Sequence, residues 1–161
     1  MERLIYQKFS KDDFEYYARL CSNEEVMNMN FGRVFTMEET NKTFAGLLKA
    51  DVNELAGYYK VYEAEGKGYV GLGAMTVNDD STEAEIEYMI LPQFWGKGYG
   101  TEIAEKMIAK AKELKTVKKI TAYTGPENLK SQKILMKHGF KSVRTFITSD
   151  DNEAEELKLI L

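Results

Sequence analysis

The chain has 161 residues, of which 43% are hydrophobic and 30% are charged, a balance that excludes an intrinsically disordered chain. Its formal net charge of -4 disfavours a nucleic-acid-binding protein, because phosphate binding usually requires a basic face. A single cysteine and a single histidine exclude an intrachain disulfide and disfavour a Cys/His zinc site or a catalytic triad. We therefore expect one domain, residues 1–161, without a bound metal.

The start of the chain carries no targeting signal that the sequence reveals. Residues 1–5 are mixed in character rather than a charged start followed by an apolar run. No apolar stretch approaches the ~20 residues that a membrane span needs. We expect a cytoplasmic protein that binds neither a membrane nor nucleic acid.

The first third of the chain is predicted to be one strand followed by helices. Ser10 is the expected N-cap of a helix that runs through Cys21, with acidic residues in its first turn. Thr36 followed by Glu39 is a capping-box pattern that opens a later helix through Leu48. The remaining elements predicted here are a strand at residues 4–9 and a short helix at 23–29.

The middle of the chain changes to a strand pattern. Residues 57–64 and 68–77 are rich in Tyr and Val and are separated by Glu-Gly-Lys, which predicts a β-hairpin. Residues 83–91 form a further strand, so three successive strands predict an antiparallel meander. A long helix with an apolar face follows Pro92.

The C-terminal part alternates between strands and helices. Residues 117–124 are predicted to be a strand, which the preceding crossover helix makes parallel to the strand at 83–91. Residues 128–138 form a helix that Gly139 closes, and two final strands follow at 140–148 and 154–161. The complete order predicts a mixed sheet with helices on its faces.

Glycines dominate the segment Trp95–Thr101, which follows a predicted strand and opens a predicted helix. Glycine lets backbone N–H groups approach a ligand, and the start of a helix adds unpaired donors and partial positive charge. The segment therefore predicts a phosphate or pyrophosphate site, to which Lys97 adds a charge. A ligand-free turn and a Rossmann dinucleotide site are alternatives, whereas the glycine–lysine spacing excludes a P-loop.

The segment Ala84–Glu102 resembles the coenzyme A-binding motif of the GNAT N-acetyltransferase superfamily. Pro126–Ser131 and Lys137–Phe140 are similar to the second cofactor motif of the superfamily, at the expected separation. Two motifs in this order are more specific than either alone. Cys21–Met27 resembles the branch that contains ribosomal-protein N-terminal alanine acetyltransferases.

This resemblance implies an α/β domain with a mixed, mostly antiparallel sheet of about seven strands, helices on both faces and a splayed parallel pair at the cofactor site. It implies acetyl-coenzyme A as co-substrate, with the pantetheine arm along the end of the splayed strand and the pyrophosphate on backbone N–H groups of the glycine turn. The residues that it assigns to the cofactor are Tyr88, Met89, Ile90, Trp95, Gly96, Lys97, Gly98, Tyr99, Gly100, Thr101, Asn128 and Ser131.

The resemblance also implies a group that meets the departing thiolate. Many relatives use a tyrosine for this purpose, and the matching position here is Leu135, which has no proton to give. Ser131 matches the serine proposed as the acid in members of the branch that lack this tyrosine. The alternative for Ser131 is a purely structural hydroxyl, and Asn128 suits a helix N-cap as well as a cofactor contact.

An amine acceptor must lose a proton before it attacks a thioester, so the reaction needs a base. Glu83, Glu85 and Glu87 alternate along one predicted strand and share a face, where repulsion raises some of their pKa values. Glu85 is our first candidate for the base, because the branch commonly has Ala-Glu-Ile there. Glu87 is the second and has a role toward the acceptor, and a solvated edge strand is the alternative for all three.

The sequence thus predicts direct transfer of an acetyl group from acetyl-coenzyme A to a primary amine in a ternary complex. A protein N-terminus and several kinds of small amine fit as acceptor, with contacts expected from residues 27–52 and 142–154. A homodimer is compatible with the sequence. Cys21 lies on a core-facing stripe, so an acetyl-enzyme is not expected. The alternative from another class is a non-catalytic module that binds coenzyme A as a sensor, which Leu135 keeps open.

Overall fold

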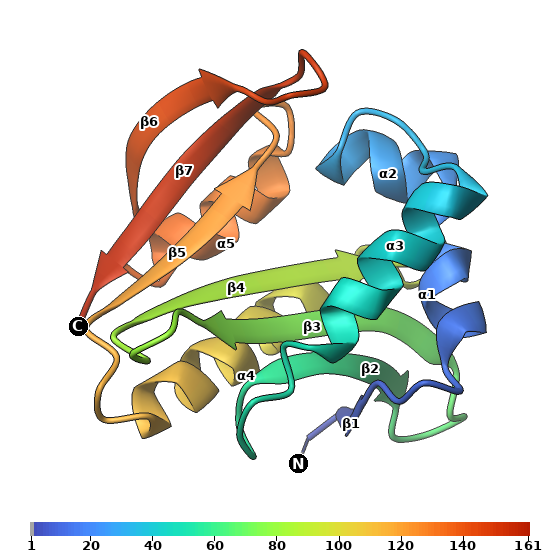
Figure 1. Ribbon diagram of the computed structural model, residues 1–161, viewed down its shortest axis with the longest axis horizontal. Coiled ribbons are helices and arrows are strands. Elements are labelled where there is room, and N and C mark those ends of the chain that lie inside the picture. The colour runs from blue at the N-terminus through green and yellow to red at the C-terminus, as the bar shows by residue number, and fades with distance from the viewer. Residues whose placement is uncertain (1) are drawn as a thin grey trace.

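Seven strands form one sheet in the computed structural model, which describes residues 2–161 (Figure 1). The strand order across the sheet is β1-β2-β3-β4-β5-β7-β6. In chain order the elements are β1 (Leu4–Lys8), α1 (Phe14–Cys21), α2 (Glu24–Asn30), α3 (Met37–Leu48), β2 (Gly57–Glu63), β3 (Tyr69–Val77), β4 (Glu83–Ile90), the short 3-10 helix η1 (Pro92–Phe94), α4 (Tyr99–Glu113), β5 (Lys119–Thr124), α5 (Leu129–Lys137), β6 (Lys141–Ile147) and β7 (Glu153–Ile160).

The strands β4 and β5 are the parallel pair of an otherwise antiparallel sheet. β4 pairs with β3 from Ala84 to Ile90, along nearly all of its length. Its pairing with β5 covers only Glu83–Glu85 against Lys119–Thr121. Figure 1 shows the two strands together at one end and diverging toward the other. The divergence opens the middle of the sheet beyond Glu85.

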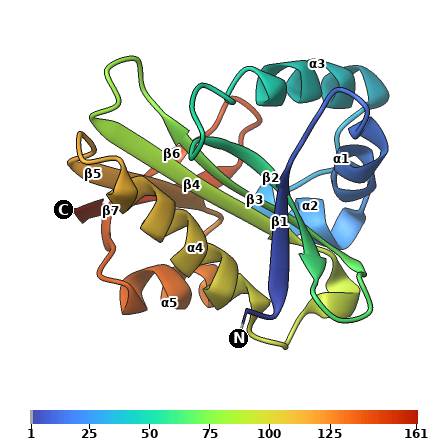
Figure 2. The ribbon, with the colours of Figure 1, turned by 90° about the horizontal axis from the view of Figure 1, so that it is seen from below.

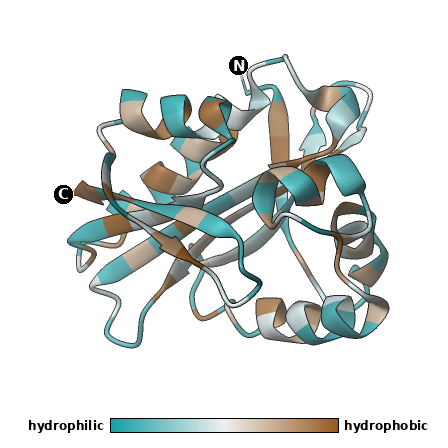
Figure 3. Ribbon diagram, turned by 90° about the horizontal axis from the view of Figure 1, so that it is seen from above, coloured by the Kyte–Doolittle hydropathy of each residue, from teal (hydrophilic) through white to brown (hydrophobic). Residues whose placement is uncertain are grey.

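Helices cover both faces of the sheet, with α4 and α5 on one face and α1, α2 and α3 on the other (Figure 2). On the first face, Ile103 and Met107 of α4 are fully buried and belong to the main apolar core with β3, β4 and β5. The helical ribbons alternate between hydrophobic and hydrophilic residues (Figure 3), as expected for helices with one face against a sheet. No helix within residues 2–161 is both long and apolar enough to cross a membrane.

The mixed α/β fold predicted from the sequence is confirmed, with element bounds close to the predicted ones. The capping box is present, since the Glu39 N–H donates to Thr36 Oγ1 at 3.1 Å and the Thr36 N–H donates to the Glu39 carboxylate at 2.9 Å. The prediction of Ser10 as a helix N-cap is wrong. α1 begins at Phe14, because the Asp13 carboxylate accepts the Ser10 N–H at 2.8 Å and folds the preceding residues into a local turn.

Candidate active site

The backbone at the end of β4 is open toward the gap between β4 and β5. The Leu91 N–H donates to the Val70 carbonyl at 2.8 Å, so the backbone of Leu91 faces β3. Because successive residues of a strand direct their backbone groups to opposite sides, those of Tyr88 and Ile90 face the gap. The Ile90 carbonyl accepts a hydrogen bond from Trp95 Nε1 at 2.7 Å. The edge at Tyr88 is therefore suited to an extended ligand that adds to the sheet like a further strand.

The glycine turn between η1 and α4 has a backbone that requires glycine. Gly96 and Gly98 have φ angles of 79° and 80°, in the left-handed region that is costly for other residues. Gly98 is the N-cap of α4, which begins at Tyr99. The first N–H groups of α4 have no carbonyl one turn earlier and lie at the positive end of the helix dipole. The turn thus has the backbone geometry that a pyrophosphate site requires.

Lys97 lies on the outside of this turn. Its ammonium is 3.7 Å from the Glu63 carboxylate and 5.5 Å from the centre of the Phe94 ring. Its carbonyl accepts a hydrogen bond from Arg3 Nη2 at 2.8 Å, and the Arg3 guanidinium also pairs with Glu102. The Lys97 side chain is therefore directed to the end of β2 and to η1, and Lys97 contributes to the turn through its backbone.

A cavity of about 600 Å³ lies between the end of β4, the glycine turn and α5, and we call it the cofactor cavity. All residues assigned to the cofactor from the sequence line it except Lys97. The other residues that line it are Met29, Asn30, Phe94, Glu127, Leu129, Lys130, Lys133 and Ile134. The structure thus brings the two predicted cofactor motifs together around one space.

Two hydroxyl groups meet at the start of α5. Asn128 Oδ1 accepts the Ser131 N–H at 3.3 Å, so Asn128 is the N-cap of this helix. Ser131 Oγ lies 2.8 Å from the hydroxyl of Tyr88. Burial raises the pKa of Tyr88 to about 12. Leu135 is only 1% exposed and packs in the apolar core, so it adds no polar group to the cavity.

A second cavity of about 880 Å³ lies between α2, the end of β5 and the β6–β7 hairpin, and we call it the acceptor cavity. The first predicted acceptor segment contributes Asn28 to Gly32, whereas α3 stays outside, and the hairpin contributes residues from Arg144 to Ala154. The two cavities adjoin near the end of β4. The residues that line both cavities are Met29, Asn30, Met89, Glu127 and Asn128.

Glu85 and Glu87 line the acceptor cavity from the same face of β4. Desolvation raises the pKa of Glu87 to about 7, the charge of Glu85 adds to the rise, and a hydrogen bond from the Tyr58 hydroxyl at 3.5 Å opposes it. Desolvation also raises the pKa of Glu85, with repulsion from Glu156 as the second cause. Solvent reaches Glu85 through the cavity, whereas Glu87 is half-buried. Glu87 therefore changes its protonation state near neutral pH.

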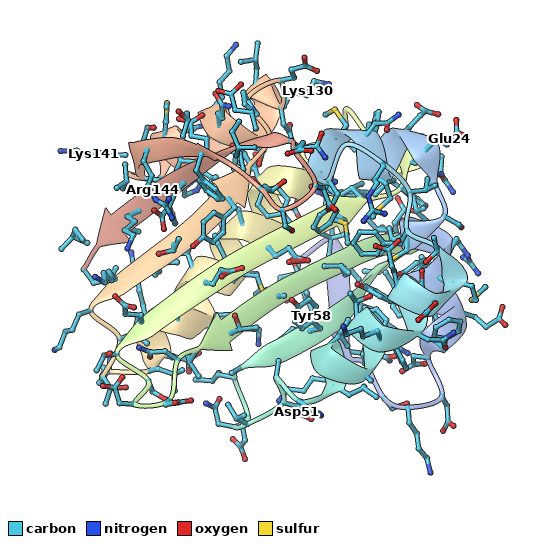
Figure 4. The ribbon with its side chains drawn as sticks, turned by 45° about the horizontal axis from the view of Figure 1, so that its top comes forward. Glu24, Asp51, Tyr58, Lys130, Lys141 and Arg144 are labelled. Atoms are coloured by element: carbon cyan, nitrogen blue, oxygen red, sulfur yellow. The ribbon has the colours of Figure 1, made fainter. Side chains whose placement is uncertain are left out.

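Three other charged groups around β4 and the hairpin have partners. Glu83 pairs with Lys119 at 2.6 Å, at the end of β4 that is remote from the glycine turn. Arg144 donates to Glu156 at 2.8 Å, and the Tyr123 hydroxyl donates to the same carboxylate at 3.1 Å. Figure 4 shows Arg144 on the hairpin side of β4 and Tyr58 on the opposite side. The positive charge of Arg144 in the cavity wall is therefore balanced by Glu156. The charged residues that line the acceptor cavity are Glu85, Glu87, Glu127, Arg144, Asp150 and Glu153.

The loop after α2 touches the turn between β6 and β7 at the rim of the acceptor cavity (Figure 1). Asn152 Nδ2 donates to the Phe31 carbonyl at 2.9 Å, and Arg33 lies 3.3 Å from Asp150. Gly32 has a φ of 80°, and a Cβ there would approach the Asn152 side chain to 2.8 Å. These contacts, which we call the rim contact, join segments that are more than a hundred residues apart in the chain.

Met29 and Asn30 lie within the expected acceptor segment 27–52, but the sequence did not place them beside the cofactor residues. They belong to no motif, and they reach both cavities only because α2 packs across the gap between β4 and β5. The aromatic wall of the acceptor cavity was predicted only in part, since Phe146 lies in the expected acceptor segment 142–154 and Tyr123 does not. Tyr123 and Phe146 pack edge to face there with ring centres 6.0 Å apart. Both were predicted on strands, but the direction of their side chains depends on the register of β5, β6 and β7.

Residues 3–141 match the sequence pattern of the acetyltransferase (GNAT) domain. The chain belongs to the GNAT acetyltransferase family. It is 26% identical over 144 residues to an uncharacterized N-acetyltransferase, YoaA, of Bacillus subtilis, a match that covers 87% of this chain and 80% of the relative. It is also 26% identical over 145 residues to the FsC-acetyl coenzyme A-N(2)-transacetylase of Aspergillus fumigatus, covering 85% of this chain and 62% of that protein.

Solved structures of acetyltransferases share the fold. An acetyltransferase from Agrobacterium tumefaciens superimposes with a TM-score of 0.80 at 19% identity, over 99% of this chain and 92% of the other. The spermidine N-acetyltransferase from Vibrio cholerae, in complex with CoA and spermine, gives 0.78 at 18% identity, over 98% and 95%. This GNAT protein is thus an acetyl-coenzyme A-dependent N-acetyltransferase. Within residues 2–161, no group of three or more His, Cys, Asp or Glu side chains has a metal-binding arrangement.

Cys21 offers a direct test of whether this GNAT protein forms an acetyl-enzyme. The thiol is fully buried, and desolvation raises its pKa to about 11, so it is a poor nucleophile. We expect Cys21→Ala to keep kcat/KM within a few-fold and to lower the free energy of unfolding by about 1 kcal/mol through the small cavity that it leaves. Steady-state kinetics and thermal unfolding measure the two effects. A folded variant without turnover would instead identify Cys21 as an acetyl carrier.

Proposed function

We propose that residues 1–161 act as one domain that transfers the acetyl group of acetyl-coenzyme A directly to a primary amine in a ternary complex. The observation that carries this proposal is the junction of the cofactor and acceptor cavities at Met89 and Asn128, at the end of β4. A thioester at this junction is open to an amine that arrives from the other side. The fully buried thiol of Cys21 supports direct attack rather than a covalent intermediate.

We propose a cationic acceptor, either a small amine or a protein N-terminus. The carboxylates of the acceptor cavity outnumber its one cation, Arg144, and that cation is paired with Glu156. Such a wall attracts an ammonium group and repels an anionic acceptor. The spermidine N-acetyltransferase from Vibrio cholerae suggests polyamines as one acceptor class. The resemblance of Cys21–Met27 to the branch of ribosomal-protein acetyltransferases supports protein N-termini as the other.

We propose Glu87 as the general base, in preference to Glu85. A base works best with a pKa near the working pH, and the pKa of Glu87 is about 7. Glu87 is also two residues nearer than Glu85 to the junction at Met89, a step of about 7 Å along a strand. Glu87 takes one proton from the bound ammonium, directly or through one water, and the neutral amine then attacks. Glu85 lines the same cavity farther from the junction, and we propose that its charge attracts the acceptor.

We propose that Ser131 acts at the departing sulfur, as a hydrogen-bond donor that stabilises the thiolate, which is a weaker role than the general acid expected from the sequence. It lines the cofactor cavity at the start of α5, close to the junction of the two cavities. The position of Leu135 in the apolar core leaves the cavity without the tyrosine that many relatives have there. A hydroxyl from Ser131 is the replacement that the helix offers, because it lies one turn earlier on the same face.

Turnover of acetyl-coenzyme A tests the proposed function. Purified protein is given acetyl-coenzyme A and a mixed set of polyamines, amino acids and peptides with different first residues, and acetylated products are identified by mass. We expect release of the free thiol and acetylation of cationic amines in preference to anionic ones. The alternative is a sensor that binds coenzyme A, which would show binding by calorimetry without thiol release from any amine. Absence of both binding and release would overturn the two readings together.

A further inference from the structure

We propose that Tyr88 positions the hydroxyl of Ser131 to donate a hydrogen bond to the departing thiolate, an inference that rests on the proposed transfer. The pair comes from two elements, Tyr88 from β4 and Ser131 from α5, and its oxygen atoms are 2.8 Å apart. Both residues line the cofactor cavity. Asn128 holds the backbone of Ser131, and Tyr88 holds its side chain, so the serine hydroxyl is fixed from two sides.

The direction of the hydrogen bond follows from the number of protons. Each hydroxyl has one proton, and oxygen accepts through its lone pairs. Burial raises the pKa of Tyr88 to about 12, so the phenol keeps its proton at any working pH. If Ser131 donated to Tyr88, its own proton would be turned away from the sulfur. Donation from Tyr88 to Ser131 leaves the serine proton free to point to the sulfur, and it also polarises the serine O–H bond.

Other groups near the cofactor cavity are less suited to this role. The Tyr99 hydroxyl donates to Glu63 at 2.5 Å, on the outer side of the glycine turn. Thr101 lies in the first turn of α4, at the phosphate end of the cavity. His138 is bonded through both ring nitrogens and is not among the residues that line the cavity. Tyr88 and Ser131 are thus the hydroxyl pair at the thioester end.

The pKa values of the Tyr88 phenol and of a thiol show how Tyr88 and Ser131 act on the departing sulfur. Glu87 first takes one proton from the ammonium. In the step, the neutral amine nitrogen bonds to the carbonyl carbon, the C–S bond breaks with its electron pair going to sulfur, and the second proton leaves the nitrogen to water. A thiol has a pKa of about 8.5, well below the pKa of Tyr88, so passing the phenol proton to sulfur is unfavourable. The pair therefore stabilises the thiolate through the Ser131 hydrogen bond, and the thiolate takes its proton from water on release. Ser131 acts as a donor that keeps its proton.

The test is a titration of bound coenzyme A, which does not require turnover. The ultraviolet absorbance of the thiolate is followed against pH for wild type, Tyr88→Phe, Ser131→Ala and the double variant, with desulfo-coenzyme A as the spectral blank. We expect the pKa of the bound thiol to be lowest in wild type and to rise in each variant. The double variant should match Ser131→Ala, because Tyr88 acts only through the serine.

Kinetics of the same variants separate positioning from structure. We expect Tyr88→Phe to lower kcat about tenfold with little change in the KM for acetyl-coenzyme A, the size of one lost hydrogen bond near a charge. Tyr59→Phe is the matched control, since it removes a buried phenol that donates to the Leu55 carbonyl at 2.7 Å outside both cavities. It should lose stability but keep the thiol pKa and kcat.

Two results would overturn the inference. One is a thiol pKa and kcat that Tyr88→Phe leaves unchanged. The other is an additive loss in the double variant, which would mean that the Tyr88 hydroxyl contacts the sulfur independently. Failure of the proposed function is distinguishable from both, because wild type would then bind coenzyme A with a lowered thiol pKa and acetylate no amine.

Discussion

Glu87→Gln is expected to lower kcat/KM for the amine by about 10²–10³-fold, the usual contribution of a general base. Glutamine keeps the shape and the contact with Tyr58 but has no lone pair basic enough to take the ammonium proton. In wild type, kcat/KM should fall as the pH drops below about 7, because Glu87 is then protonated. In the variant this break should be absent. Comparison with wild type isolates the enzyme group, since the ionisation of the acceptor is common to both.

Stability provides the control for this variant. Desolvation and the charge of Glu85 raise the pKa of Glu87 from 4.5 to about 7 in the folded protein. The stability that this shift contributes is present below pH 4.5 and is lost as the pH rises through 7. Glu87→Gln should therefore be more stable than wild type at pH 8 while being less active. Glu85→Gln is the matched variant and should keep a kinetic break, moved to lower pH because the charge of Glu85 no longer raises the pKa of Glu87. A Glu87→Gln enzyme with full activity and an unchanged break would remove Glu87 from the mechanism.

Gly98→Ala is expected to weaken the binding of acetyl-coenzyme A by at least about tenfold, equal to ~1.4 kcal/mol. Gly98 has a φ of 80°, and alanine would relax toward a negative φ and turn the first N–H groups of α4 away from the cofactor cavity. Calorimetry with acetyl-coenzyme A measures the change. Wild-type affinity in the folded variant would show that the pyrophosphate does not depend on this backbone.

Gly66→Ala separates the backbone strain from the loss of a ligand contact. Gly66 lies in the turn between β2 and β3, has a φ of 74° and has no heavy atom within 4 Å of an added Cβ. Both substitutions should lower the free energy of unfolding by roughly 1–2 kcal/mol. Only Gly98→Ala should change the affinity for acetyl-coenzyme A.

Local patterns in the sequence were sufficient for the elements of the fold and for most of the residues that surround one of its two cavities. The glycines of Trp95–Thr101 predict a turn with positive φ angles. The N-cap role of Asn128 is predicted in the same way, from residues close in the chain. Ser10 shows the limit of such patterns. Ser10 is a residue type that favours N-caps, but its own N–H donates to the Asp13 carboxylate, and α1 begins only at Phe14.

The acceptor side could not be predicted to the same depth, because it depends on packing between distant segments. The sequence placed Glu85 and Glu87 on one face, but their ranking as a base depends on how closely protein surrounds each carboxyl group. Tyr88 was assigned to the cofactor through its backbone. Its hydroxyl reaches Ser131 only because α5 crosses the open end of β4, which no pattern along the chain encodes.

The rim contact joins two surface segments that both border the acceptor cavity. Asn152 and Phe31 fasten the hairpin turn to the loop after α2 without touching the glycine turn or the start of α4. Under the proposed function, substitutions in these two surface segments would change the entrance for the amine and leave the binding of acetyl-coenzyme A unchanged. Proteins of this fold could thus accept different amines while keeping the same acetyl donor, because the two segments at the entrance contact each other rather than the glycine turn.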